Sequence, residues 1–324
     1  MKMQKDSRQS FEELADFDLE LGSATSSLYR NGRQQVKLTV KIRAIDVNGN
    51  DLALSDAERK SLHLVQYKGS AELPQEWVSS TTYDGYEYFP ASERRAARDG
   101  APRDTEYFDF YVSSTASSPM QVAAQITRDD GVIIRTNGTT SHPDKYPHKH
   151  DSSVTLTPVT PPNYPLDHYH LVKERVQGDA GEWNPTFIDN HYLSLNDNRG
   201  QVIDFRAAGM TMNPAGMVQW HDKVVTETHV SYVGYGQPGE AQAYFNPEIY
   251  LENHTPDPTV LRPKPGQCTI ILVARADIRY HNDSANRHNG PCLIHVEDVY
   301  GNEHKLRVTF ASTTNRFDLT LSKA

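Results

Sequence analysis

The stretch QVKLTVKIRAID, residues 35–46, decides the fold class of this chain. Apolar residues alternate with polar ones along it, at Val36, Leu38, Val40, Ile42 and Ala44. Such alternation predicts a β-strand with one face on a core and the other in water. The Asn-Gly pair in the following DVNGN indicates a tight turn.

Similar runs recur along the whole chain. They include LHLVQY, YEYF, EYFDFYVSS, MQVAAQITRDDGVIIRT and SVTLTPV, and later FIDNHYLSL, MVQW, KVVTETHVSYVGY, EIYLEN, CTIILVARADIRY and RFDLTLS. Ser55-Asp-Ala-Glu58 has the spacing of a helix capping box and predicts one short helix. Short strands at regular spacing, with little room for helices, are typical of β-sandwiches. We therefore predict an all-β fold.

A proline-rich stretch, TPVTPPNYP, divides the chain into two halves. Proline removes backbone donors and fixes an extended geometry, so this stretch is interpreted as a linker. A chain of 324 residues can bury two separate cores. We predict two tandem immunoglobulin-like β-sandwich domains, at 25–159 and 167–324, joined by a Pro-rich linker at 160–166.

The first 24 residues are polar and acidic and are predicted to form a flexible N-terminal arm, 1–24. Phe17, Leu19 and Leu21 alternate within it, so the arm could dock as an edge strand or supply a strand to a neighbour.

Composition limits the partners. Lys and Arg total 33 against 42 for Asp and Glu, and this net charge of −9 argues against a nucleic-acid partner. The sequence contains no transmembrane segment and begins without a Sec signal peptide. We expect cytoplasmic synthesis, with export without a Sec signal as an alternative.

The sequence contains two cysteines, Cys268 and Cys292. Both fall in apparent strands and are expected to be buried and free.

One histidine motif has metal-site spacing. Asp167-His168-Tyr-His170-Leu-Val-Lys-Glu174 resembles the first metal motif of the cupins, and His221 follows a loose Pro-x-Gly candidate for the second. This resemblance implies a metalloenzyme that uses His168, His170 and Glu174, perhaps joined by His221 as a fourth ligand. The metalloenzyme is the alternative hypothesis, because our main interpretation of the sequence assigns neither a cofactor nor a metal to the protein. The sequence lacks the Gly-x-Ser-x-Gly, Walker, His-Glu-x-x-His and dinucleotide motifs.

A second histidine-rich segment, SHPDKYPHKHDSS at 141–153, contains His142, His148 and His150. Prolines separate these histidines, and neighbouring lysines would repel a dication. We interpret the segment as a surface loop.

Tyrosines suggest a binding surface. In EYFDFYVSS, Phe108 and Phe110 would face the core, which leaves Tyr107 and Tyr111 on the opposite face. Tyr86 and Tyr88 lie in the preceding YEYF run. Rows of exposed tyrosine suit protein or carbohydrate recognition, because they combine rigid area with a polar tip. The predicted surface comprises Tyr86, Tyr88, Tyr107 and Tyr111.

Two windows of the sequence echo one another. IRAIDVNGN (42–50) and IHVEDVYGN (294–302) place Ile, Asp-Val and Gly-Asn in register. A strand that runs into Asp-x-x-Gly-Asn resembles bacterial immunoglobulin-like domains of the invasin and intimin type. The resemblance implies a sandwich fold and an extracellular or particle-surface binding role, and it assigns no site residues.

These observations favour a non-catalytic binding or structural protein that contacts a protein partner or assembles with itself. A component of a toxin, of a phage-like or tail-like particle, or of an adhesive complex would fit. The alternatives are the cupin-like metalloenzyme and a leaderless secreted toxin that binds a host membrane or glycan.

Overall fold

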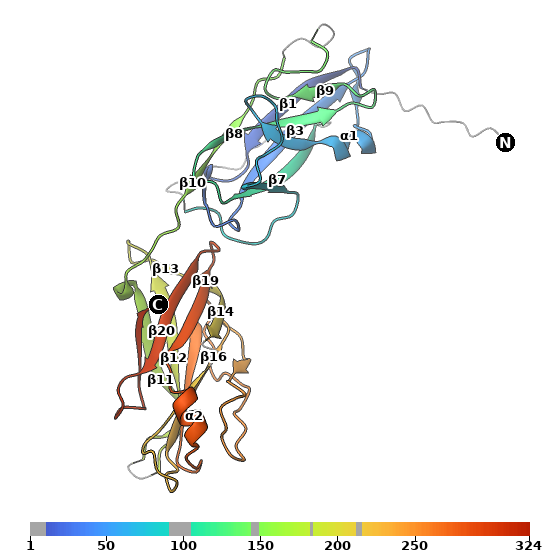
Figure 1. Cartoon of the computed structure of the whole chain (residues 1–324). Helices are drawn as coiled ribbons and strands as arrows, with labels where there is room; N and C mark the ends of the chain where they lie inside the picture. Colours follow the sequence, from blue (N-terminus) through green and yellow to red (C-terminus); the bar gives the residue numbers. More distant parts are fainter. Residues whose placement is uncertain (1–10, 91–104, 144–148, 182–183, 212–215) are drawn as a thin grey trace, which may run out of the picture. The chain divides into compact units, whose positions relative to one another are not determined.

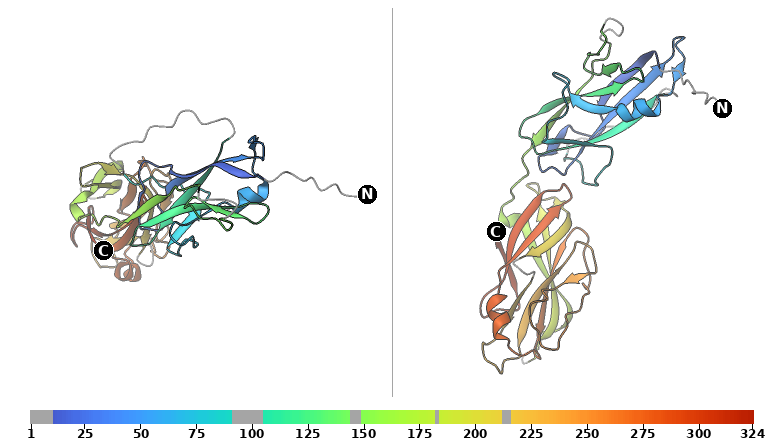
Figure 2. Two further views of the ribbon diagram at one scale, coloured as in Figure 1. Left: turned by 90° about the horizontal axis from the view of Figure 1, so that it is seen from above. Right: turned by 45° about the vertical axis from the view of Figure 1, so that its right-hand side comes forward.

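The computed structural model describes residues 11–90, 105–143, 149–181, 184–211 and 216–324. The regular secondary structure of the described residues is nearly all β-strand, in sheets whose pairings are antiparallel except that of β2 (Ser27–Tyr29) with β10 (Val154–Val159), which confirms the all-β prediction (Figure 1). The described residues also include two short α-helices, α1 (Asp56–Ser61) and α2 (Asn282–Arg287) (Figure 2). Neither of these helices, the longest in the described part of the chain, is long or apolar enough to cross a membrane.

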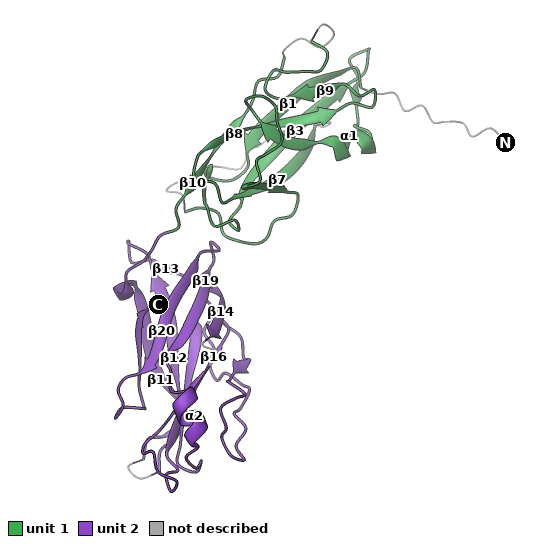
Figure 3. Ribbon diagram, viewed as in Figure 1, with its two compact units in different colours: residues 1–161 green, residues 162–324 purple. Residues whose placement is uncertain are grey.

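The chain divides into two compact units, Met1–Pro161 and Pro162–Ala324 (Figure 3). The division falls inside the proline-rich stretch TPVTPPNYP. The predicted domain and linker boundaries themselves stay predictions.

The first sheet of unit 1 is built around residues 35–46, the stretch QVKLTVKIRAID. That stretch forms β3 (Val36–Ile45), whose residues alternate between buried and half-buried as predicted. The strand order is β1-β3-β7-β6, with β4 beside β3. The partner strands are β1 (Glu13–Leu21), β7 (Glu106–Ser114), β6 (Trp77–Ser80) and β4 (Asp51–Leu52).

Part of the predicted N-terminal arm belongs to the core of unit 1. Phe17 and Leu19 on β1 are buried, and so are Phe11 and Leu14. β1 pairs antiparallel with β3 of the same chain and is the edge strand of its sheet. The structure thus places residues 13–21 in a paired strand, because four large apolar side chains gain more from the core than from water. Residues 1–10 of the arm lie outside the described residues.

The second sheet of unit 1 has the order β2-β10-β8-β5, with β9 beside β8. Its strands are β2 (Ser27–Tyr29), β10 (Val154–Val159), β8 (Met120–Thr127), β5 (His63–Gln66) and β9 (Ile133–Arg135). Inward residues of both sheets, such as Leu38 and Ile126, form one hydrophobic cluster. α1 begins at the predicted capping box of Ser55 and Glu58.

Unit 2 has a seven-stranded and a four-stranded sheet. The larger comprises β11 (Tyr169–Asp179), β12 (Thr186–Asn196), β18 (Cys268–Arg275), β16 (Val230–Gly236), β15 (Met217–Trp220), β13 (Val202–Ile203) and β17 (Ala243–Tyr244). The smaller comprises β14 (Phe205–Thr211), β19 (Cys292–Asp298), β20 (Glu303–Phe310) and β21 (Leu319–Lys323). One cluster joins residues of both sheets, and a second cluster includes Tyr232, Ile271 and Leu251.

The echoed turns have the same geometry in the two units. In unit 1, Asp46 Oδ1 accepts the backbone N–H groups of Asn48 and Asn50 at 2.8 and 2.9 Å. In unit 2, Asp298 Oδ1 accepts those of Tyr300 and Asn302, both at 2.9 Å. The echo therefore reflects a shared local hydrogen-bond pattern, which polar turn chemistry is sufficient to produce.

Two predicted strands are loops. YEYF (86–89) and EIYLEN (248–253) both lack strand pairing, although alternating aromatic and apolar residues suggested it. Residues 223–229 of KVVTETHVSYVGY also precede β16 as a loop. Pattern alone does not distinguish a strand from an extended loop whose apolar residues are buried.

Candidate functional site

The predicted tyrosines gather on the outer face of the first sheet of unit 1. Tyr83 lies at the centre, with its ring 5.5 Å from that of Tyr88 and 5.3 Å from that of Tyr111 between centroids. Its hydroxyl donates to the backbone carbonyl of Tyr86. Tyr107 lies on β7, four residues before Tyr111, and 49% of it is exposed. We call these five residues the tyrosine surface.

Sequence reasoning chose four of the five members and omitted the central one. Tyr83 precedes the YEYF run, so an assumed strand register gave it no place beside Tyr88. Burial, together with the neighbouring rings of Tyr83 and Tyr111, raises the pKa of Tyr88 to about 12. Tyr88 is therefore a neutral phenol at physiological pH, held within the cluster by ring contacts.

Two buried glutamines hold the loop that carries these rings, residues 81–90, which we call the tyrosine loop. Gln34 Nε2 donates to the carbonyl of Glu87 at 2.9 Å. Gln35 accepts the N–H of Asp84 at 2.8 Å and donates to its carboxylate at 3.1 Å. Both glutamines are at most 2% exposed. Buried amide pairs of this kind fix the loop before any partner arrives.

Charges of both signs surround the tyrosine surface. Asp109 lies between Tyr107 and Tyr111 on β7, 2.7 Å from the ammonium of Lys37. On the adjacent strands, Lys41 pairs with Asp16 at 3.4 Å. On this outer face Lys37 and Lys41 each have a carboxylate partner, within a chain whose net charge is −9.

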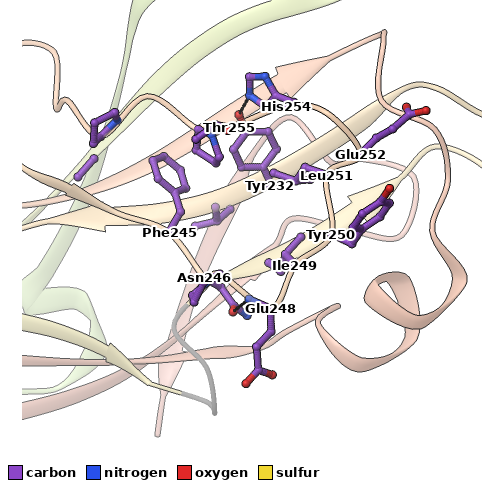
Figure 4. Close-up of a pocket in the computed structure, with 15 residues that line it drawn as sticks. Tyr232, Phe245, Asn246, Glu248, Ile249, Tyr250, Leu251, Glu252, His254 and Thr255 are labelled. Atoms are coloured by element: carbon purple, nitrogen blue, oxygen red, sulfur yellow. Dashed lines mark hydrogen bonds between the residues drawn. The ribbon is translucent and has the colours of Figure 1, made fainter.

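Unit 2 has a pocket of about 520 Å³, which we call the loop pocket (Figure 4). It lies beside residues 245–258, which we call the pocket loop. The rings of Tyr232 and Phe245 line the loop pocket together with Tyr250, and the carboxylates of Glu248 and Glu252 lie apart on its rim. Glu252 has a φ of 55°, a left-handed conformation that costs a non-glycine residue energy. Aromatic walls with a few polar groups suit a small polar ligand.

The loop of this pocket is anchored in the second core cluster of unit 2. Ile249 and Leu251 are buried there at 8% and 6% exposure. Tyr232 and His254 share a hydrogen bond of 2.7 Å at the pocket wall. Burial raises the pKa of Tyr232, and burial lowers that of His254. A neutral phenol and a neutral imidazole therefore share this hydrogen bond.

The cupin-like residues do not converge on one point. His168 belongs to the short 3₁₀-helix Leu166–His168, and its Nδ1 contacts the carbonyl of Asn196 at 2.8 Å. His170 and Glu174 lie on β11 four residues apart, which separates them by roughly 13 Å. The Glu174 carboxylate is bound by Arg262 and Lys264, both at 3.0 Å.

The fourth candidate, His221, belongs to a different cluster. Within the described ranges, His221, Asp222 and Glu227 form the group of His, Cys, Asp and Glu residues whose ligand atoms all lie within 4.8 Å of one another. The sequence analysis selected His221 but neither Asp222 nor Glu227. Four residues of loop separate the two acids, and no local spacing predicts how that loop folds.

The histidines of the 141–153 loop are dispersed. His142 is exposed, and the ring of His150 packs edge-on against Phe17 at 5.9 Å. Burial and the nearby Lys149 lower the pKa of His150. His148 lies outside the described residues.

Both cysteines are free and buried, as predicted. Burial raises the pKa of Cys268 to about 12 and that of Cys292 to about 11. Neither thiol is therefore a ready nucleophile at neutral pH.

No family model and no curated protein match this sequence. Among solved structures, domains 4 and 5 of the S-layer protein SbsC are similar at 12% identity and a TM-score of 0.24, over 91% of this chain and 97% of that one. Domains 5–6 of the same protein give 8% and 0.21, over 94% and 100%. The Yersinia pseudotuberculosis adhesin InvE gives 9% and 0.23, over 89% and 57%. At TM-scores this low, no ligand, partner or activity passes from these proteins to this chain.

Proposed function

We propose that this chain is a non-catalytic binding or structural protein of two tandem immunoglobulin-like β-sandwiches joined by a Pro-rich linker. In this proposal the tyrosine surface of unit 1 makes the contact with another protein. A component of an adhesive complex, of a toxin or of a tail-like particle would use such a surface.

The observation that carries the proposal is the preorganised tyrosine surface. Tyr83, Tyr88 and Tyr111 are already in contact, and Gln34 and Gln35 hold their loop. Tyrosine supplies a large contact area with two side-chain torsions, so little entropy is lost when it binds. Sites at the centre of protein interfaces are enriched in this residue.

Charge favours a second copy of the chain as the partner to test first. A net charge of −9 repels copies of the protein over most approaches. Around the tyrosine surface, however, Lys37 pairs with Asp109 and Lys41 pairs with Asp16. These two ion pairs remove part of the repulsion between copies that meet on this face.

Sedimentation velocity across a range of concentrations tests the proposal. We expect the average mass of the wild-type protein to rise with concentration and to fall back to the monomer in a Tyr83→Ser/Tyr107→Ser variant. Tyr244→Ser, which removes an exposed tyrosine of unit 2, is the matched control and should assemble normally. A wild-type protein that stays monomeric would contradict self-assembly.

The loop pocket favours glycan recognition as a second candidate function. Sugars offer apolar faces to an exposed ring such as that of Tyr250, and hydroxyls to carboxylates such as Glu248. A panel of immobilised glycans would test it: binding that Tyr250→Ala removes supports the pocket, and binding that Tyr107→Ser removes instead assigns the sugar to unit 1.

A further inference from the structure

A third feature lies in the loop between β15 and β16, residues 221–229. The backbone N–H of His221 donates to the carbonyl of His229 at 2.9 Å, so these two residues close the base of the loop. Two valines near its tip, Val224 and Val225, are 52% and 83% exposed. An apolar tip that is exposed to water does not stabilise a loop of this length. The shape of the loop 221–229 therefore depends on the polar contacts at its base.

Those polar contacts converge on Glu227. Its Oε1 accepts the N–H of Thr228 at 2.8 Å and also contacts His229 Nδ1 at 2.8 Å. Its Oε2 accepts the N–H of Asp222 at 3.1 Å. Burial alone would raise the pKa of Glu227, but the hydrogen bonds from His229 and Thr228 hold that pKa below its ordinary value. The carboxylate of Glu227 is therefore ionised and held in position by these hydrogen bonds, and its Oε2 has a further lone pair for another partner.

The side chain of His221 faces two carboxylates rather than one. Its Nδ1 lies 3.3 Å from Asp222 Oδ2 and 3.5 Å from Glu227 Oε2. Both separations are long for hydrogen bonds. They match the edges of a tetrahedron around an ion with ligands at 2.0–2.2 Å, which are about 3.3–3.6 Å long.

We propose that His221, Asp222 and Glu227 bind one Zn²⁺ ion, which clasps the loop 221–229 at its base. One imidazole nitrogen and two carboxylate oxygens are donors that Zn²⁺ accepts, and water completes the coordination. His229 is a positioning residue, because its Nδ1 holds Glu227 Oε1 and leaves Oε2 directed at the ion. A hollow of about 500 Å³, lined in part by His221 and Lys223, lies beside the proposed site on the side of His221.

Charge at the site is compatible with a dication. Burial lowers the pKa of Arg316, while the nearby carboxylates of Glu227 and Asp222 raise it. Its guanidinium thus lies within electrostatic reach of both acids and weakens the attraction for a metal. The ammonium of Lys223, next to Asp222 in the chain, is solvent-exposed and therefore screened by water, unlike the buried guanidinium of Arg316. One guanidinium does not neutralise two carboxylates, so Asp222, Glu227 and Arg316 together keep a net negative charge that Zn²⁺ offsets.

The experiment uses untagged full-length protein stripped of metal and titrated with ZnCl₂ by calorimetry, with thermal unfolding and trypsin cleavage at Lys223 measured in parallel. We expect one Zn²⁺ per chain, a higher Tm and slower cleavage. His221→Ala and Asp222→Asn replace exposed side chains, so both variants should fold and lose all three effects.

His170→Ala is the matched control, because His170 is an exposed histidine outside the cluster. It should bind Zn²⁺ as the wild type does. The proposal is overturned if the wild type binds no Zn²⁺, if His221→Ala and Asp222→Asn bind it undiminished, or if His170→Ala loses it.

Discussion

The tyrosine loop of unit 1 and the pocket loop of unit 2 (residues 245–258) each contain a run that was predicted to be a strand, and they are held in place in different ways. Both alternate aromatic with polar or apolar residues, and both looked like strands in the sequence. Ile249 and Leu251 attach the pocket loop to a hydrophobic cluster. The tyrosine loop is attached by the buried amides of Gln34 and Gln35.

This difference explains the two shapes. Where apolar residues are drawn into the core, the backbone follows them and leaves a concave pocket beside it. Where amides hold the backbone of residues 81–90, Tyr83 stays exposed, Tyr86 and Tyr88 are half-buried, and the surface is an aromatic patch. Concave pockets suit small ligands, and aromatic patches suit protein partners.

The largest expected effect breaks the apolar anchor. Leu251→Ala should lower the free energy of unfolding by about 2–5 kcal/mol, because it removes a buried side chain and leaves a cavity. Urea denaturation of the full chain measures it. Val225→Ala, at a residue that is 83% exposed, should change stability by less than about 0.5 kcal/mol. Equal losses in the two variants would show that the pocket loop is not anchored through the core.

The amide anchor should be weaker. Gln35→Ala leaves the N–H of Asp84 without its acceptor and should cost about 1–3 kcal/mol. Hydrogen exchange should rise in residues 82–87 and stay unchanged in the loop pocket. Gln66→Ala is the control, since its side-chain bond to the carbonyl of Glu72 is exposed. Unaltered hydrogen exchange in residues 82–87 would show that Gln35 does not hold the tyrosine loop.

The pocket loop, which contains His254, and the tyrosine loop should also differ in their response to pH. Burial holds the pKa of His254 below 6.5, so the unfolded chain takes up its proton first. The stability that His254 contributes is therefore present above about pH 6.5 and lost as the pH falls below it.

Thermal unfolding at about pH 7.5 and pH 5.5 tests this contribution. The decrease in Tm between the two pH values should be smaller in His254→Gln than in the wild type. The amides of Gln34 and Gln35 do not titrate, so the tyrosine loop should be insensitive in this range. An identical pH dependence in variant and wild type would contradict the assignment.

The smallest expected effect separates the ring of Tyr83 from its hydroxyl. Tyr83→Phe removes the bond to the carbonyl of Tyr86 but keeps the contacts with Tyr88 and Tyr111. It should cost at most about 1 kcal/mol and leave assembly intact. Assembly lost in Tyr83→Phe would mean that the surface acts through its hydroxyl groups rather than its ring area.

Strands with strict alternation were predictable from the sequence. β3 follows the pattern residue by residue, because one of its faces lies on the core, whereas the last three residues of β7 are all buried. The loops were not predictable, since Ile249 and Leu251 alternate as a strand would and only their lack of pairing partners makes them a loop. The position of Gln34 and Gln35 beneath Tyr83, and the approach of Glu227 to His221, depend on contacts between distant residues. No local pattern encodes either.

The most direct test of the account is hydrogen exchange of the full chain, compared between dilute and concentrated protein. If the tyrosine surface makes the contact between copies, protection should increase with concentration in residues 82–88 and along β7, and not in the pocket loop. Protection that leaves residues 82–88 and β7 unchanged and increases elsewhere would contradict the central claim.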